Sequence, residues 1–267
     1  YPERVDDVAW ENDLTAFRAY GPALQETGER AFGYDIWTKY NTTEPVVEAR
    51  YEGELNPDMK AKIAELGKTD PKAAQELYRS VSYHVDHGNG LDCYKVGPTL
   101  GGGTTALMAG DTIVYPYCYA TQEILDNGPL RFTVKLVYNP LVVKGDSTII
   151  ETRIITLDAG SYCNKTVVSY TNLKETMPLA VGIVLHEPDG AIVADAANGY
   201  MTYVDPTDNA GGDNGKIFVG AAFPTLVKEA KAVLFPEKEK KELRGGADGH
   251  VLAISEYEPG ADFTYYW

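Results

Sequence analysis

The sequence predicts a mainly β protein, an antiparallel β-sandwich that carries a short helical insertion. From residue 111 onward, segments rich in Val, Ile, Thr and Tyr are separated by clusters of Gly, Pro, Asn and Asp. A helical pattern is confined to about residues 56–80. Strands this numerous with no helix between them form antiparallel sheets that pack face to face. The 267 residues are enough for a sizeable core.

The helical insertion comes first along the chain. Asn56-Pro57 and Asp70-Pro71 each read as a capping residue followed by proline at the first helical position. Gly67 reads as the stop between two short helices. Both helices carry an apolar stripe, and two short helices cannot bury both stripes alone. We therefore expect the pair to pack on the outside of a sheet or over one end of a cleft.

The strands follow the insertion. We expect them at residues 112–119, 130–138, 148–157, 166–172, 179–186, 191–196, 200–204, 216–221 and 251–257. The Lys- and Glu-rich residues 224–245 interrupt the series and are expected to form a helix or a solvated excursion. Length alone allows one or two domains, and we expect a single β-sandwich domain over residues 1–267.

Composition excludes some classes of partner. The formal net charge is −15 and the sequence has no run of Lys or Arg, so nucleic acid is not an expected partner. A few arginines gathered in one cleft would still attract an anionic substrate. No apolar run is long enough to span a membrane. Tyr outnumbers Phe by 19 to 7, which gives the aromatic surface many hydroxyls able to face water or a ligand.

The segment from Arg4 to Pro22 is the most informative part of the sequence. It mixes arginines, carboxylates, an amide and aromatic rings, without the alternation of a core strand or a helical stripe. Rings can cover the C–H faces of a sugar while Arg, Asp and Asn bind its hydroxyls or a carboxylate. The alternative is a surface loop with scattered charges. The expected substrate-binding residues are Arg4, Asp7, Trp10, Asn12, Arg18, Tyr20 and, from a second polar segment, Tyr83.

The second polar segment runs from Tyr83 to Tyr94. If residues 82–86 continue as a strand, His84 and Asp86 project to one face. A histidine beside a carboxylate suits acid–base catalysis near neutral pH, whereas the alternative is a turn with solvated histidines. We expect the two polar segments to line one concave surface. The expected catalytic residues are His84, His87, Asp86, Tyr94 and Glu11.

No cofactor or bound metal is expected. The spacing of His84, Asp86 and His87 fits no established zinc pattern, and the three cysteines lack the short CxxC spacing. The oxygen-rich residues 205–209 and 213–215 could hold calcium. They lack the EF-hand spacing, however, and also fit an Asx-rich turn between two strands.

The sequence resembles a Bacteroidetes family of unknown function whose genes accompany enzymes that degrade pectin and related uronic-acid glycans. The resemblance implies a β-supersandwich of the galactose-mutarotase and polysaccharide-lyase type, a chain that continues beyond residue 267, and a periplasmic or extracellular location. It assigns no catalytic residue. The matching segments are Arg4-x-Asp6-Asp7-x-Ala9-Trp10-Glu11-Asn12-Asp13, Phe17-Arg18-x-Tyr20-Gly21-Pro22, Tyr83-His84-x-Asp86 through Gly97-Pro98, and Thr156-Leu157-Asp158-Ala159-Gly160-Ser161.

These observations predict a carbohydrate-active protein, and the leading hypothesis is an enzyme that cleaves uronate-containing oligosaccharides such as pectin fragments by elimination or hydrolysis. In this hypothesis His84 transfers a proton and Arg18 binds a substrate carboxylate. An aldose mutarotase or epimerase that uses Glu11 with His84 is the enzymatic alternative. A non-catalytic glycan-binding module that stacks sugars on Trp10, Trp37 and tyrosines is the other.

Overall fold

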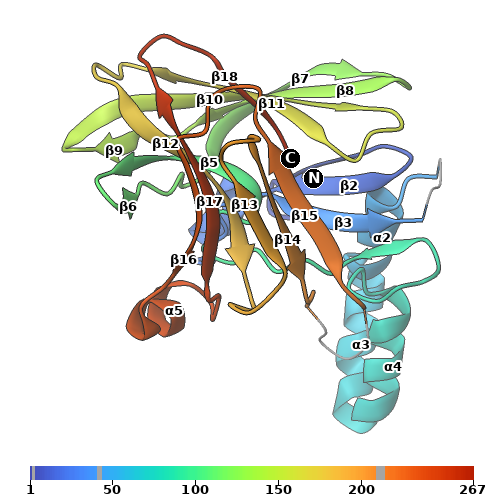
Figure 1. The fold of residues 1–267 in the computed structure, drawn as a ribbon. Coiled ribbons are helices and arrows are strands. Elements are labelled where there is room, and N and C mark those ends of the chain that lie inside the picture. The colour runs from blue at the N-terminus through green and yellow to red at the C-terminus, as the bar shows by residue number, and fades with distance from the viewer. Residues whose placement is uncertain (2–3, 41–43, 209–213) are drawn as a thin grey trace.

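The computed structural model describes residues 1, 4–40, 44–208 and 214–267, and it confirms a mainly β fold with antiparallel sheets and few helices (Figure 1). The strands of the described residues form three sheets. The main sheet contains β7 (Tyr119–Asn127), β8 (Arg131–Tyr138), β9 (Leu141–Val143), β10 (Asp146–Asp158), β11 (Asn164–Thr171), β13 (Ile192–Asp195), β14 (Tyr200–Asp205), β15 (Ile217–Ala222) and β18 (Phe263–Tyr266). Its order is β13-β14-β15-β18-β11-β10-β8-β7, with β9 paired to β10.

The other two sheets are smaller. The second sheet consists of β16 (Glu229–Leu234), β17 (Gly249–Tyr257), β12 (Met177–Leu185), β5 (Gly102–Ala109) and β6 (Thr112–Ile113), in that spatial order. The N-terminal sheet consists of β1 (Val8–Glu11), β2 (Thr15–Ala19), β3 (Asp35–Lys39) and β4 (Gly90–Asp92), also in that order.

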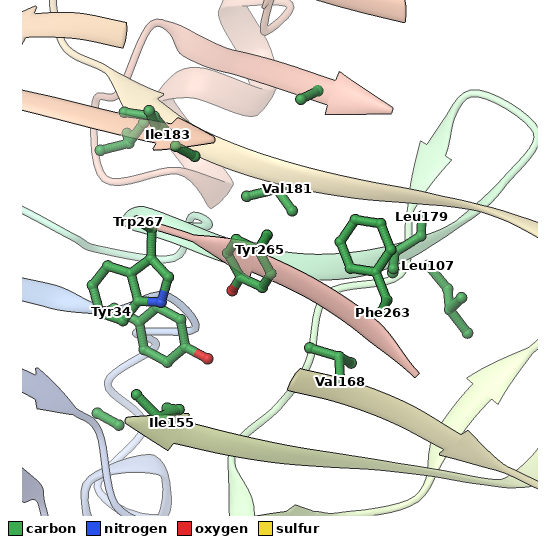
Figure 2. Packing of buried hydrophobic residues seen from close by; sticks show 14 of the residues in the cluster. Tyr34, Leu107, Ile155, Val168, Leu179, Val181, Ile183, Phe263, Tyr265 and Trp267 are labelled. Carbon is green, nitrogen blue, oxygen red and sulfur yellow. The ribbon is translucent and has the colours of Figure 1, made fainter. Parts of the chain in front are cut away.

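The main and second sheets pack around one large apolar core. Burial along β10 alternates with a period of two, so that Ile155 faces the core while its neighbour Ile154 is half-buried. In Figure 2, the β18 side chains Phe263 and Tyr265 lie between residues of β12 and residues of β10 and β11. Nearly every residue of β12 is buried, because a further apolar cluster around Leu100 covers its other face.

The N-terminal sheet was not expected from the sequence. β1 and β2 pair as an antiparallel hairpin inside the Arg4–Pro22 segment, whose composition argued against a strand. All five residues of β2 are buried, including Arg18, so this strand has no polar outer face. The expected alternation is absent because polar side chains here are buried against one another.

Two other strand predictions need correction. Of the expected strand 112–119, only Thr112–Ile113 pairs with β5, and the chain then crosses to begin β7 at Tyr119. β7 is exposed along almost its whole length, which leaves no apolar alternation to detect. Residues 224–245 contain the edge strand β16 as well as a helix, and both are largely exposed.

The structure contains five helices within the described residues: α1 (Pro22–Glu26), α2 (Val47–Glu54), α3 (Pro57–Thr69), α4 (Pro71–Val81) and α5 (Glu237–Leu243). Both predicted caps are confirmed, because the Asn56 side chain accepts backbone hydrogen bonds at the start of α3 and the Asp70 side chain does so at the start of α4. The predicted stop at Gly67 is wrong. α3 continues to Thr69 and ends before Asp70, whose extended backbone is favoured by the following proline.

The expected packing of the insertion is also wrong for α3 and α4. These helices pack on each other and project from the body of the molecule (Figure 1). α3 has no buried residue and α4 has only Ala74. The helix that covers the N-terminal sheet is α2, whose Val47 and Tyr51 join a buried cluster with Trp37.

A buried ion pair lies inside the sandwich. Arg153 and Glu151 are both on β10 and fully buried, with Arg153 Nε 2.6 Å from Glu151 Oε1. Glu151 accepts a hydrogen bond from the Thr105 hydroxyl on β5, and Arg153 donates to the Thr105 carbonyl. Arg153 also donates to the hydroxyls of Tyr34 and Tyr138 at 2.9 and 2.8 Å. The pair therefore links the two faces of the sandwich.

We expect Arg153→Met to lower the free energy of unfolding by about 3–5 kcal/mol, because it leaves the Glu151 carboxylate buried without a counter-charge. The double variant Glu151→Leu with Arg153→Met should recover part of this loss, since neither charge is then buried. Urea unfolding followed by tryptophan fluorescence measures both values. A double variant that is no more stable than the single variant would contradict the assignment.

Candidate functional site

Arg18 brings the two predicted polar segments together. Its Nη2 lies 2.8 Å from Asp92 Oδ2 and also contacts Asp35, while its Nε is 3.9 Å from Asp7 Oδ2. The guanidinium also donates to the hydroxyls of two tyrosines on the same cluster. We call this group the Arg18 cluster; it consists of Asp7, Arg18, Tyr20, Asp35, Tyr51 and Asp92.

The cluster is buried, which corrects the predicted role of Arg18. Only 4% of the Arg18 surface is exposed, and its three carboxylate neighbours are equally buried. The guanidinium is already surrounded by carboxylates and hydroxyls, so it has no place for a substrate carboxylate. The two polar segments meet, but they do so in a buried network rather than on an open surface.

Burial changes the proton affinity of this cluster. Burial raises the pKa of Asp35 to about 7 against the opposing effect of Arg18, and the nearby charge of Asp92 raises it further. Burial also raises the pKa of Asp7 to about 6, although Arg18 and Arg4 oppose the shift. Arg4 Nη1 lies 3.7 Å from Asp7 Oδ2. The cluster therefore takes up protons at a pH where exposed carboxyls are ionised.

His84 lies at the surface beside the Arg18 cluster. It belongs to a turn after α4 rather than to a strand, so the predicted shared face with Asp86 is wrong. Its Nδ1 is 3.1 Å from the Asp92 carbonyl oxygen and 3.8 Å from Asp92 Oδ2, and 47% of its side chain is exposed. The carboxylate beside His84 is therefore that of Asp92.

Asp86 and His87 make local contacts in the same turn. Asp86 accepts hydrogen bonds from the Tyr40 hydroxyl at 2.9 Å and from the Gly88 N–H at 2.7 Å. His87 Nε2 lies 2.9 Å from the Ser82 carbonyl oxygen. Both side chains are exposed and stabilise the turn, which agrees with the alternative interpretation of this segment.

Trp10 and Glu11 also have structural contacts instead of the predicted ligand-facing positions. Trp10 is 3% exposed, and its Nε1 donates to Asn164 Oδ1 at 2.8 Å. Glu11 accepts a hydrogen bond from Lys39 Nζ at 2.6 Å and from the backbone N–H groups at the start of α2. Neither the Trp10 ring nor the Glu11 carboxylate is available to a sugar.

Three further residues that were predicted to bind or act on a substrate also make structural contacts instead. The Asn12 amide donates to two carbonyl groups of the loop after β10 and accepts from the β1–β2 turn. The Tyr94 hydroxyl donates to the Gly101 carbonyl at 3.1 Å inside the core. Tyr83 is buried and stacks on Trp37 with ring centroids 5.3 Å apart. These side chains hold the N-terminal sheet in place.

A second histidine–carboxylate pair lies elsewhere in the fold. His186, directly after β12, has its Nδ1 2.6 Å from Oδ2 of Asp205 at the end of β14. Asp205 is fully buried and its other oxygen accepts from the Thr207 N–H. This carboxylate fixes the orientation of the His186 ring. The pairing was not visible in sequence because the two residues lie on different sheets.

The metal predictions can be compared only in part. Within residues 1, 4–40, 44–208 and 214–267, no three His, Cys, Asp or Glu side chains gather so that they could hold a metal ion. Asn209 and Asp213 of the predicted calcium segment lie outside these ranges. Among the helices of the described residues, none has the length and apolarity needed to cross a bilayer.

An aromatic groove is the main feature that the sequence analysis missed. Its volume is about 550 Å³, and its lining residues come mainly from the N-terminal sheet and from strands β14, β15 and β18 of the main sheet. Its walls are mostly apolar, and four exposed aromatic rings surround it. These rings are Tyr162, Tyr200, Phe218 and Tyr266, with exposed fractions of 67, 38, 82 and 38%.

The pairing register places two of these rings in one row across the main sheet. Tyr200 pairs with Ala222, and Ala222 pairs with Tyr266. Tyr266 pairs in turn with Lys165 on β11, which pairs with Thr156 on β10. Neighbouring strands lie about 4.8 Å apart, so the row extends over about 20 Å. The small side chain of Ala222 leaves open space between the two rings.

The row leads from the aromatic groove into a smaller polar cavity of about 340 Å³. The two cavities share Cys163 and Tyr266 in their linings. Lys165 lines the polar cavity, is exposed, and has no carboxylate within ion-pair distance in the described part of the chain. Arg131 in the same cavity is already paired with Asp158, at 2.6 and 2.9 Å.

Comparison with known proteins identifies the family. All of residues 1–267 match the family described as Domain of unknown function (DUF4861), and the chain belongs to this family. It is also similar to "Uncharacterized protein P7" from Formosa agariphila, with 29% identity over 209 residues. The match covers 76% of this chain and 46% of that protein, so the chain spans about half the length of this relative.

We expect the protein to lose stability between about pH 5 and about pH 8. Asp7 and Asp35 have a higher pKa in the folded than in the unfolded chain, so the folded state binds more protons in this window. The contribution of these two groups is fully present below the pKa of an unfolded aspartate, about 4, and is lost as the pH rises from there through the folded values of about 6 and about 7. Asp35→Asn should reduce the fall by on the order of 1 kcal/mol or more, measured by urea unfolding at both ends of the window.

A matched control for this measurement is Asp195→Asn. Asp195 is half-buried, and hydrogen bonds from Asn198 lower its pKa, so it is ionised throughout the window. The variant should keep the wild-type pH dependence. Equal pH dependence in wild type and Asp35→Asn would show that the cluster does not hold the extra proton.

Proposed function

We propose that the aromatic groove binds an oligosaccharide and that this chain is a glycan-recognition unit. The observation that carries the proposal is the group of exposed aromatic rings around an apolar groove. The C–H face of a sugar ring can pack on such a side chain, while tyrosine hydroxyls bind sugar hydroxyls. The volume is in the range of cavities that hold small ligands.

We also propose that the bound glycan is acidic, with uronate units as in pectin fragments. Lys165 supports the proposal of an acidic glycan, because this residue pairs with Tyr266 on the neighbouring strand and lies in the same row. A sugar stacked on Tyr266 would bring a neighbouring carboxylate close to this cation. A lysine without an ion-pair partner loses no existing contact when it binds such an anion.

The groove favours recognition over cleavage. Elimination and hydrolysis both need a positioned acid and base. Among the described residues that line the groove there is no Asp, Glu or His. The Lys39 ammonium, which also borders the groove, is held by Glu11 and by carbonyl groups. The glycan-binding alternative therefore has more support than the enzymatic hypothesis at this site.

Tyr266→Ala is expected to weaken binding of galacturonate oligosaccharides roughly tenfold or more, because a stacking surface at the centre of the row is lost. Lys165→Met should weaken binding of the same oligosaccharides but spare neutral galactose oligosaccharides of equal length. Isothermal titration calorimetry measures both effects.

Two exposed side chains on α4 provide matched controls. Tyr78 has an exposure of 40%, close to that of Tyr266, and Lys72 is an exposed lysine. Tyr78→Ala and Lys72→Met should keep wild-type affinity. Affinities that are the same for Tyr266→Ala and Tyr78→Ala would rule out the groove as the binding site.

A second candidate function is acid–base catalysis on uronate-containing oligosaccharides at His84. One observation favours it: the His84 imidazole is half exposed, and its Nδ1 lies 3.1 Å from the Asp92 carbonyl oxygen and 3.8 Å from the Asp92 carboxylate. The epimerase version with Glu11 is not proposed again, because Lys39 and the start of α2 occupy the Glu11 carboxylate.

If His84 transfers a proton, His84→Ala should lower turnover of pectic oligosaccharides about 10²-fold with little change in KM. The ultraviolet absorbance of new unsaturated uronates reports elimination, and the release of reducing ends reports hydrolysis. Thermal unfolding serves as the control for folding, since a half-exposed side chain can be removed without opening the core. Wild-type turnover in His84→Ala would exclude this candidate.

A further inference from the structure

A second cavity lies between α5 and the second sheet, away from the aromatic groove. Its volume is about 420 Å³, and apolar side chains from β5, β16 and β17 form much of its wall. Polar groups from five different segments also reach it. These are Asp111, Tyr115, Lys231, Glu239, Arg244 and His250. A cavity with apolar walls and a few convergent polar groups is the usual form of a small-molecule site.

His250 supplies a buried hydrogen-bond donor in this cavity. The residue is 1% exposed, and its Nε2 accepts a hydrogen bond from the Leu100 N–H at 3.0 Å. Nδ1 must therefore carry the proton in the neutral ring. Over the ranges that the structure describes, no acceptor is hydrogen bonded to Nδ1. Burial lowers the pKa of His250 to about 3, with a further effect from Arg244, so the ring stays neutral at physiological pH.

Arg244 supplies a pre-oriented cation in the same cavity. Its guanidinium lies over the Tyr115 ring at 4.0 Å and 5.4 Å from the Phe235 ring centroid. Nε donates to Glu239 Oε1 at 2.8 Å, Nη2 lies 2.7 Å from the same oxygen, and Nη1 donates to the Pro98 carbonyl at 3.0 Å. Two of the five guanidinium N–H groups therefore remain for a ligand.

We propose that this cavity binds a small monocarboxylate with an aromatic or branched aliphatic body. The carboxylate accepts hydrogen bonds from His250 Nδ1–H and from the remaining N–H groups of Arg244, and charge-assisted bonds of this kind are the stronger ones. The apolar walls hold the body of the ligand. Asp111 and Glu239 disfavour a second negative charge, so a dicarboxylate does not fit. None of these residues belongs to the aromatic groove, so the inference is independent of the proposed function.

Benzoate is the probe for this site, with acetate and benzyl alcohol as comparison ligands that lack the ring or the carboxylate. Titrations of the intact chain are followed by NMR of the histidine ring nitrogens and by thermal unfolding. Benzoate should shift the His250 Nδ1 resonance in a saturable manner and raise the unfolding temperature. Acetate and benzyl alcohol should do so only at much higher concentration.

Arg244→Met should weaken benzoate binding roughly tenfold or more, because the charge-assisted hydrogen bonds are lost. Arg30→Met is the matched control. Arg30 also lies over a tyrosine ring, that of Tyr117 at 5.4 Å, but outside the cavity. This variant should bind benzoate like the wild type.

A variant at the cavity mouth covers the case in which Arg244→Met does not fold. Leu234 lines the cavity but is 57% exposed, so the core does not depend on it and we expect Leu234→Trp to fold. The larger tryptophan ring would then fill the cavity. It should abolish benzoate binding. The proposal is overturned if the wild type shows no saturable benzoate binding, if acetate binds equally well, or if a folded Arg244→Met or Leu234→Trp binds benzoate like the wild type.

Discussion

The three sheets of this molecule meet at one buried guanidinium, that of Arg153. A cation inside an apolar core must be surrounded by acceptors, because the cost of removing it from water is otherwise too high. Its acceptors come from β10 itself, from Thr105 on β5, from Tyr138 at the end of β8 and from Tyr34 just before β3. None of these segments can shift without leaving a polar group unpaired. The interaction thus ties the N-terminal sheet to the sandwich.

The position of the groove follows from this constraint. The Tyr34 ring stacks on the Trp267 ring (Figure 2). Their centroids are 4.3 Å apart, and Trp267 directly follows β18. The Trp267 ring also packs against Phe17 on β2. The polar network at Arg153 therefore fixes Tyr34, Tyr34 fixes the end of β18, and β18 forms one wall of the groove between the two sheets.

The fold was predictable where apolar residues are the buried ones and polar residues face solvent or cap a helix. β10 and β11 alternate between buried and half-buried residues, and Asn56 and Asp70 cap helices where the sequence places them. The prediction failed at β7, which is exposed along nearly its whole length, and in the N-terminal sheet, which buries charged residues. In these segments the residue types do not show which side faces the core.

The candidate site was predictable to a smaller extent. Arg18 and Asp92 do come together from separate polar segments, but Arg18 donates to Asp92 inside a buried network of carboxylates and hydroxyls. A single sequence does not distinguish such a closed network from an open binding site. The row that contains Tyr200, Tyr266 and Lys165 depends on the pairing of β14, β15, β18 and β11. Residues on four strands become neighbours only through this register, which local patterns do not determine.

The projecting helices α3 and α4 give the molecule two levels of stability. Their contacts are mainly with each other and with α2, and only Ala74 among their residues is buried. If the two helices separate from the body, little buried apolar surface becomes exposed. If β12 separates from its neighbouring strands, both apolar clusters of the sandwich are disrupted. The helical hairpin can therefore unfold locally while the sheets stay intact, and we expect its amide hydrogens to exchange with solvent before those of the central strands.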